Sequence, residues 1–111
     1  MDLFNPAAIV PYFQFKRTLF SAGLAAGTKI APYNSSRVVL MISPSGGSVI
    51  ASPVAFAAAG DGISFNDTSN GSILTWQNHS ILCVLDWYLT ASPASNFTVT
   101  EISFYPPIGG A

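Results

Sequence analysis

The chain has 111 residues, of which 50% are hydrophobic, 13% are aromatic and only 8% are charged. Four basic residues and a net charge of −1 argue against direct binding to nucleic acid, and the high hydrophobicity argues against intrinsic disorder. A weakly charged, apolar chain of single-domain length tends to associate, so we expect one domain that forms a homo-oligomer within a larger assembly.

The first 16 residues are rich in large apolar side chains without any periodicity, and Pro6 and Pro11 interrupt them. Because proline disfavours a regular helix or a central strand, we expect residues 1–16 to form an extended arm that docks on a neighbouring chain. The alternative is that this arm folds back on its own domain. The side chains expected to contact the partner are Phe4, Ile9, Tyr12, Phe13 and Phe15.

The middle of the chain consists of β-rich segments that are separated by turn residues. They cover residues 37–43, 48–55, 62–65, 72–77, 80–89 and 96–105. No window longer than about twelve residues keeps apolar side chains at helical spacing. The sequence therefore predicts an all-β fold, a small β-sandwich or jelly-roll-like single domain over residues 17–105, followed by an extended tail at residues 106–111.

Turn residues and apolar runs indicate how two of these strands pair and how deeply another is buried. The Asn-Gly pair at residues 70–71 is the strongest hairpin signal in the chain, so residues 62–65 and 72–77 are predicted to pair. The apolar run at residues 81–85 predicts a strand that is covered on both faces. It contains the only cysteine, Cys83, for which we expect the role of a small buried hydrophobe.

The apolar side chains of the last strand change faces along its length. Phe97 and Val99 share one face, whereas Ile102 and Phe104 share the other. Since side chains alternate in a strand, the odd spacing between these pairs predicts a bulge near residues 100–101, or a strand that passes from one contact surface to another.

Residues 38–60 carry no charge and are long enough to span a bilayer. They also contain Pro44, Gly46, Gly47 and Pro53, which would leave backbone groups unsatisfied in lipid. We therefore predict two strands joined by a turn, and no membrane span. The first residues lack the basic and apolar regions of a signal peptide, so we expect none.

Candidate catalytic groups are few. His79, Ser80 and Asp86 have the chemistry of a hydrolase triad, but neighbouring residues in a strand point to opposite faces, and the chain has no G-x-S-x-G motif. Asp86 is expected to be a buried hydrogen-bond acceptor or a partner of Arg37. The polar loop at residues 61–70 lacks the spacing of a calcium loop. We predict no catalytic residue, no cofactor and no metal site.

Four short motifs lie between residues 28 and 104. They are Ile30-x-Pro32-x-Asn34-x-x-Arg37 before a strand, the pair Gly62-Ile63, the pair Trp87-Tyr88, and Val99-x-Glu101 in the last strand. This layout resembles small β-sandwich structural proteins of tailed-bacteriophage virions, of the capsid decoration (cement), collar or fibre type. The resemblance implies a component of the virion, and it assigns no functional residue.

The expected function is that of a capsid decoration protein that stabilises the phage head by burying apolar surface between subunits. Its partners would be further copies of the chain, in a trimer, and other virion proteins such as the major capsid protein. The alternative is a carbohydrate-binding adhesin, fibre or collar domain of a phage. In that case Trp76 or Trp87 should lie exposed beside the loop at residues 66–71, whereas tryptophans of small β proteins are usually core or interface residues.

Overall fold

A computed structural model describes residues 13–55, 61–66 and 73–104, which form two antiparallel four-stranded sheets. The strands are β1 (Phe13–Phe20), β2 (Lys29–Ala31), β3 (Arg37–Pro44), β4 (Ser48–Ser52), β5 (Ile63–Asn66), β6 (Ile73–Thr75), β7 (Trp87–Leu89) and β8 (Phe97–Phe104). Two short helical segments, α2 (Trp76–His79) and η3 (Ser80–Cys83), connect β6 to β7. The prediction of an all-β domain is confirmed.

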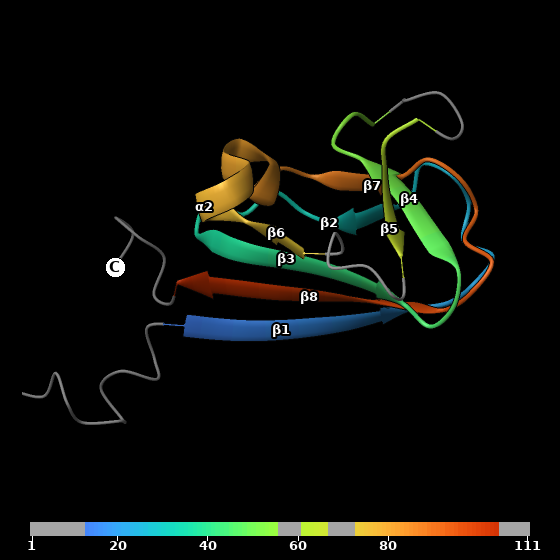
Figure 1. Cartoon of the computed structure of the whole chain (residues 1–111), viewed down its shortest axis with the longest axis horizontal. Coiled ribbons are helices and arrows are strands. Elements are labelled where there is room, and N and C mark those ends of the chain that lie inside the picture. The colour runs from blue at the N-terminus through green and yellow to red at the C-terminus, as the bar shows by residue number, and fades with distance from the viewer. Residues whose placement is uncertain (1–12, 56–60, 67–72, 105–111) are drawn as a thin grey trace, which may run out of the picture.

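The connectivity is that of a jelly roll. Within the two sheets the strands run in the orders β1-β8-β3-β6 and β2-β7-β4-β5 (Figure 1). Strands therefore pair from the two ends of the chain inward, β1 with β8, β2 with β7, β3 with β6 and β4 with β5. A long antiparallel ribbon rolled up in this way places alternate strand pairs in opposite sheets, which defines the fold.

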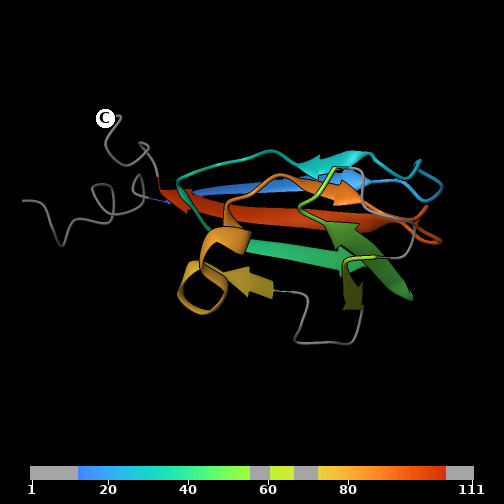
Figure 2. The same cartoon turned by 90° about the horizontal axis from the view of Figure 1, so that it is seen from above.

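The core lies between the inner faces of the two sheets, and every strand contributes to it. Its fully covered side chains are Ile30, Ala31, Leu40, Ile42, Val49, Ala51, Phe65, Leu74, Trp87, Leu89, Phe97 and Val99. Phe20 of β1 closes one edge by stacking on Phe97, with 5.0 Å between the ring centroids. In Figure 2 the helical segments lie at one end of the sandwich, and the loops after β1 and β7 lie at the other.

The uncharged stretch at residues 38–60 supplies two strands, as predicted, because β3 and β4 are joined by the short turn at residues 45–47. Among the described residues, neither helical segment has the length and apolar character of a membrane span. Gly62 precedes β5 with a φ of 130°, and a Cβ there would collide with the backbone oxygen of Ala51. Only glycine lets this segment approach β4 so closely.

Part of the segment that we expected to be an arm is a strand. β1 pairs with β8 in unbroken register, from Phe13 opposite Phe104 to Phe20 opposite Phe97. The domain boundary expected after residue 16 thus falls inside β1. The two prolines that suggested an arm come earlier in the chain, so they do not interrupt this strand. Phe4, Ile9 and Tyr12 lie outside the described residues.

The predicted hairpin between residues 62–65 and 72–77 is wrong. β5 pairs with β4 and β6 pairs with β3, so the two strands lie in different sheets. The predicted strand at residues 80–89 is also too long, because residues 80–83 form η3 and only Trp87–Leu89 form β7. Thr75 ends β6 early by accepting a hydrogen bond from the Asn78 amide as the N-cap of α2.

Of the two alternatives predicted for the last strand, β8 shows the second: its apolar side chains pass from the inner face to the outer face, and no bulge in β8 is needed. β8 is regular against β1, and the register shift lies in β3, between Arg37 and Val39. Phe97 and Val99 do share the inner face. That face continues with Glu101 and Ser103, both buried, so the inner side of β8 changes from apolar to polar rather than turning outward.

Candidate functional site

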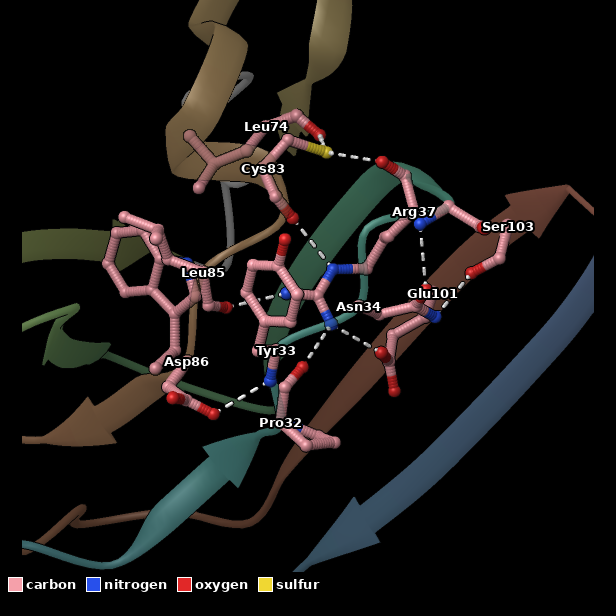
Figure 3. A network of polar contacts seen from close by, with 12 residues as sticks. Pro32, Tyr33, Asn34, Arg37, Leu74, Cys83, Leu85, Asp86, Glu101 and Ser103 are labelled. Atoms are coloured by element: carbon pink, nitrogen blue, oxygen red, sulfur yellow. Dashed lines mark hydrogen bonds and ion pairs between the residues drawn. The ribbon is translucent and has the colours of Figure 1, made fainter. Parts of the chain in front are cut away.

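A buried polar network around Arg37 closes the end of the sandwich that carries the helical segments (Figure 3). The guanidinium group has no exposed surface, and its Nη1 donates to Oε1 of Glu101 over 2.6 Å. Its other bonds reach backbone oxygens, from Nε to Cys83 (2.7 Å), from Nη1 to Pro32 (2.9 Å) and from Nη2 to Leu85 (2.7 Å). One side chain thereby ties two connecting segments to β3 and β8.

This network explains why residues 83–86 do not extend β7. The carbonyls of Cys83 and Leu85 accept hydrogen bonds from Arg37, and the carbonyl of Val84 accepts from the backbone amide of Asn34. Carbonyls used in this way are not free to join a strand ladder. The apolar side chains of residues 83–85 are therefore explained by packing against the interior of the domain, and they do not indicate a longer strand.

Asn34 is the second centre of the network. Its Nδ2 donates to the Ser103 hydroxyl over 3.0 Å, and its Oδ1 accepts from the Ser36 amide over 2.9 Å. Asn34 and Arg37 belong to one motif of the sequence and Glu101 to another, and the fold brings the two motifs together. The signal was a charged residue inside each of two otherwise apolar segments, but the sequence did not reveal that Glu101 is the partner of Arg37.

Asp86 is a hydrogen-bond acceptor, as one of the two predictions stated, but it is not buried and it forms no salt bridge with Arg37. It is partly exposed, accepts a hydrogen bond from the Tyr33 amide over 2.7 Å, and lies 3.4 Å from the ammonium group of Lys29. The Tyr33 hydrogen bond is the main reason why the pKa of Asp86 lies below its ordinary value. The salt bridge to Arg37 belongs instead to Glu101 of β8, whose Oε1 lies 2.6 Å from Nη1 of the guanidinium group.

Cys83 is buried, as expected, with its Sγ 3.7 Å from the backbone oxygens of Arg37 and Leu74. Burial raises the pKa of this thiol, and the nearby charge of Arg37 offsets part of that rise. A thiol with a raised pKa is a weak nucleophile at neutral pH. Cys83 is thus a packing residue of the network.

The residues of the hydrolase triad have other partners. Nδ1 of His79 accepts a hydrogen bond from the Thr75 amide over 3.1 Å. Ser80 begins η3 with a φ of 51°, and the Asp86 carboxylate is held by Tyr33 and Lys29. Within the described ranges, no three His, Cys, Asp or Glu side chains gather closely enough to hold a metal ion. Much of the polar loop at residues 61–70 lies outside those ranges.

The two tryptophans lie in different environments. Trp87 is fully buried, donates from its indole nitrogen to the Leu82 carbonyl, and meets Phe65 edge-on at 5.8 Å between ring centroids. It has no surface that a sugar ring could stack on. Trp76 is 51% exposed and lines a small pocket of about 220 Å³ together with Val38 and Phe104.

An open polar groove of about 440 Å³ lies where β2 stops covering the inner face of β1 and β8. Its lining residues are Gln14, Lys16, Pro32, Tyr33, Asn34, Ser35, Ser36, Glu101 and Ser103. Asn34, Glu101 and Ser103 are already bound to one another or to Arg37. The floor of the groove is thus part of the structural network rather than a set of free ligand-binding groups.

The outer face of the β1-β8-β3-β6 sheet is the most unusual surface of the described structure. The register of its strands places Phe15, Ile102, Val39 and Thr75 in one row, and Arg17, Thr100, Met41 and Ile73 in the next. Several of its large apolar side chains are exposed, namely Phe13 (52%), Phe15 (63%), Leu19 (74%) and Ile73 (39%), with Trp76 beside them. Arg17 is the one charged side chain on the strands of this face.

Phe13 and Phe15 therefore belong to this outer face and not to a free arm. Phe13 packs against Phe104 at 5.2 Å between ring centroids, which fixes its place on the sheet.

Comparisons of the chain with models of known families, with curated proteins and with solved structures find no significant match. The function therefore has to be inferred from the geometry of this domain.

Proposed function

We propose that this chain is a non-catalytic structural protein of a virion, a capsid decoration (cement) protein that stabilises a phage head by burying apolar surface between subunits. The observation that carries the proposal is the exposed, almost uncharged outer face of the β1-β8-β3-β6 sheet. Soluble monomers rarely expose large contiguous apolar patches, and such patches mark interaction sites.

Burial of this face against neighbouring subunits would release enough free energy to hold the chain in an assembly. Full burial of a large apolar side chain is worth about 1.5–3 kcal/mol, and Phe13, Phe15 and Leu19 are each more than half exposed. A subunit that binds only the assembled lattice stabilises that lattice by mass action. Further copies of the chain and the major capsid protein are the partners we propose, and the expected trimer stays a prediction.

The topology supports this function by analogy. Jelly rolls are the fold of many viral capsid domains, and they also occur in lectins and cupins. Because one fold serves many functions, the analogy does not distinguish these classes. The rigid sandwich and its internally satisfied polar network suit a protein whose task is to present a surface.

The carbohydrate-binding alternative now depends on Trp76, since Trp87 is buried. Trp76 lines its small pocket together with Val38, Phe104 and the exposed Ser35. An exposed indole next to the Ser35 hydroxyl offers an apolar face on which a sugar ring could stack. On the proposed function, however, Trp76 belongs to the assembly face, and its replacement should impair incorporation into particles rather than glycan binding.

Quantifying the chain in purified particles tests the proposal. A capsid-wide decoration protein should be present in hundreds of copies, as symmetric capsids require, whereas about a dozen copies or fewer would indicate a collar or tail protein. Phe15→Glu should abolish incorporation, because it places a charge on the apolar face. Gln14→Glu, at the adjacent exposed position on the other face of β1, should be incorporated normally. Absence of the wild-type chain from particles would refute the proposal.

A further inference from the structure

β1 is the longest sheet edge in the described part of the chain. It has eight residues, whereas the strands at the other three edges, β6, β2 and β5, have three, three and four. The outer side of an edge strand presents unpaired N–H and C=O groups, which form a template for another strand. β1 contains no proline and no bulge that would block such pairing.

We propose that β1 pairs antiparallel with β1 of a second copy of this chain, so that two β1-β8-β3-β6 sheets join into one eight-stranded sheet. Among the described edges, only a second β1 is long enough to pair with β1 over five or more residues. Pairing of an edge with its own copy is an isologous contact that closes around a two-fold axis. The pairing deepens the proposed function, on which it rests, by naming the first partner of the apolar face.

The side chains restrict the register of this pairing. A two-fold axis perpendicular to the sheet passes midway between the two strands and keeps outer-face residues opposite outer-face residues, so one residue of β1 must lie directly opposite its own copy. An axis at Lys16 or at Arg17 places two like charges directly opposite each other, which is unfavourable. Of the registers that pair at least five residues of β1, those centred on Phe15 and on Thr18 avoid this repulsion.

Of these two registers, the one centred on Phe15 has the better pairs. It sets Phe15 against its own copy, Phe13 against Arg17, and Gln14 against Lys16. Aromatic pairs and cation–aromatic contacts both stabilise neighbouring strands. The register centred on Thr18 instead sets Lys16 against Phe20, whose ring is already stacked on Phe97 in the core. The geometry therefore points to the register in which the two copies of Phe15 face each other across the two-fold axis.

Cysteine cross-linking of the purified full chain tests both the pairing and its register. Opposite residues of antiparallel strands have Cα atoms about 4.5–5.5 Å apart, within the range of about 4.4–6.8 Å that a disulfide needs. Phe15→Cys should therefore form disulfide-linked dimers on mild oxidation. The native Cys83 is buried, so the wild-type chain provides the background.

Leu19→Cys is the matched control, because Leu19 lies on the same face and is more exposed than Phe15. In the proposed register the two copies of residue 19 are eight positions out of alignment, more than about 20 Å apart. This variant should not cross-link. Equal cross-linking of both variants, or cross-linking of Arg17→Cys alone, would overturn the register.

The mass of the native protein in solution tests the pairing without any cysteine. Light scattering should give a dimer for the wild type and a monomer for Phe15→Lys, with the same circular dichroism spectrum for both. A monomeric wild type would overturn the pairing, and so would the trimer expected from the sequence, because a closed three-fold ring contains no two-fold contact. Failure of the pairing leaves the copy number in particles unaffected, and a dimer that is absent from particles would refute only the proposed function.

Discussion

The two faces of the β1-β8-β3-β6 sheet differ in an unexpected way. Toward the helical end, the inner face carries Arg37, Glu101 and Ser103, and each of these buried polar side chains has a partner. The outer face carries large apolar side chains that are exposed. Apolar side chains alone therefore do not identify the core of this domain. In this sheet, hydrogen-bonded polar side chains are buried on the inner face, and large apolar side chains are exposed on the outer face.

Arg37→Met should have the largest effect on stability. Removing one partner of a buried ion pair leaves the other charge uncompensated, which costs about 3–5 kcal/mol. Arg37 also supplies hydrogen bonds to three backbone carbonyls, which would lose their donor. We expect the free energy of unfolding, measured by urea denaturation, to fall by about that amount.

The same substitution on the outer face is the control. Arg17→Met replaces an exposed arginine and should change the stability of the chain by less than about 0.5 kcal/mol. Adding Glu101→Leu to Arg37→Met should recover part of the loss, because the unpaired carboxylate is removed. A loss below about 1 kcal/mol for Arg37→Met would show that the network is not a stabilising element.

Neighbouring residues of β3 allow the two faces to be compared directly. Ile42 is fully buried on the inner face, and Met41 is partly buried on the outer face. Ile42→Ala should destabilise the isolated domain by about 2–5 kcal/mol, and Met41→Ala by less than half as much. Thermal unfolding measured at low protein concentration makes the comparison, and equal losses would mean that the outer face is part of a core.

The sequence predicted the fold class but only part of the strand pairing. Segments 37–43 and 96–105 were identified as strands, and both are central in the structure as β3 and β8. β1 was missed because its first residues, with Phe13 and Phe15, continue the non-periodic apolar stretch at residues 1–16, which suggests an arm when no sheet is known. The hairpin prediction relied on a local turn signal, whereas strand pairs in a jelly roll form between distant segments.

The network around Arg37 could be predicted only in outline. Arg37 and Glu101 are 64 residues apart, and their side chains meet because β3 and β8 are neighbours in the sheet. Asp86 is another acidic residue in an apolar segment and is nearer in sequence, so the composition of the segments did not choose between the two. The choice depends on the register of β3 against β8, which the bulge in β3 alters.

The rate at which a thiol reagent modifies Cys83 should show how rarely the buried network around Arg37 opens to solvent. Burial raises the pKa of this thiol above its ordinary value of 9.0, so it stays protonated and protected at neutral pH. We expect a thiol reagent to modify it at least about a hundredfold more slowly than an added cysteine at the exposed position 81, made by Ile81→Cys. Rapid modification of the folded wild type would show that the network opens easily, and Arg37→Met should speed the reaction.

The smallest expected effect concerns Asp86, at the partly exposed rim of the network. The Tyr33 amide, and to a lesser degree Lys29, hold the pKa of Asp86 below its ordinary value of 3.8 in the folded chain. A lowered pKa in the folded state gives stability that is present above the unfolded pKa and is lost as the pH falls through the folded pKa. The stability difference between wild type and Asp86→Asn should therefore be constant near neutral pH and shrink below about pH 4.

Lys29→Met separates the two causes of this shift. Because the Tyr33 hydrogen bond is the larger cause, Lys29→Met should keep most of the acid-dependent loss that Asp86→Asn removes. Urea denaturation from neutral pH down to about pH 2 measures all three proteins. If Lys29→Met abolished the pH dependence, the exposed ion pair with Lys29, and not the hydrogen bond from the Tyr33 amide, would be the main cause of the lowered pKa of Asp86.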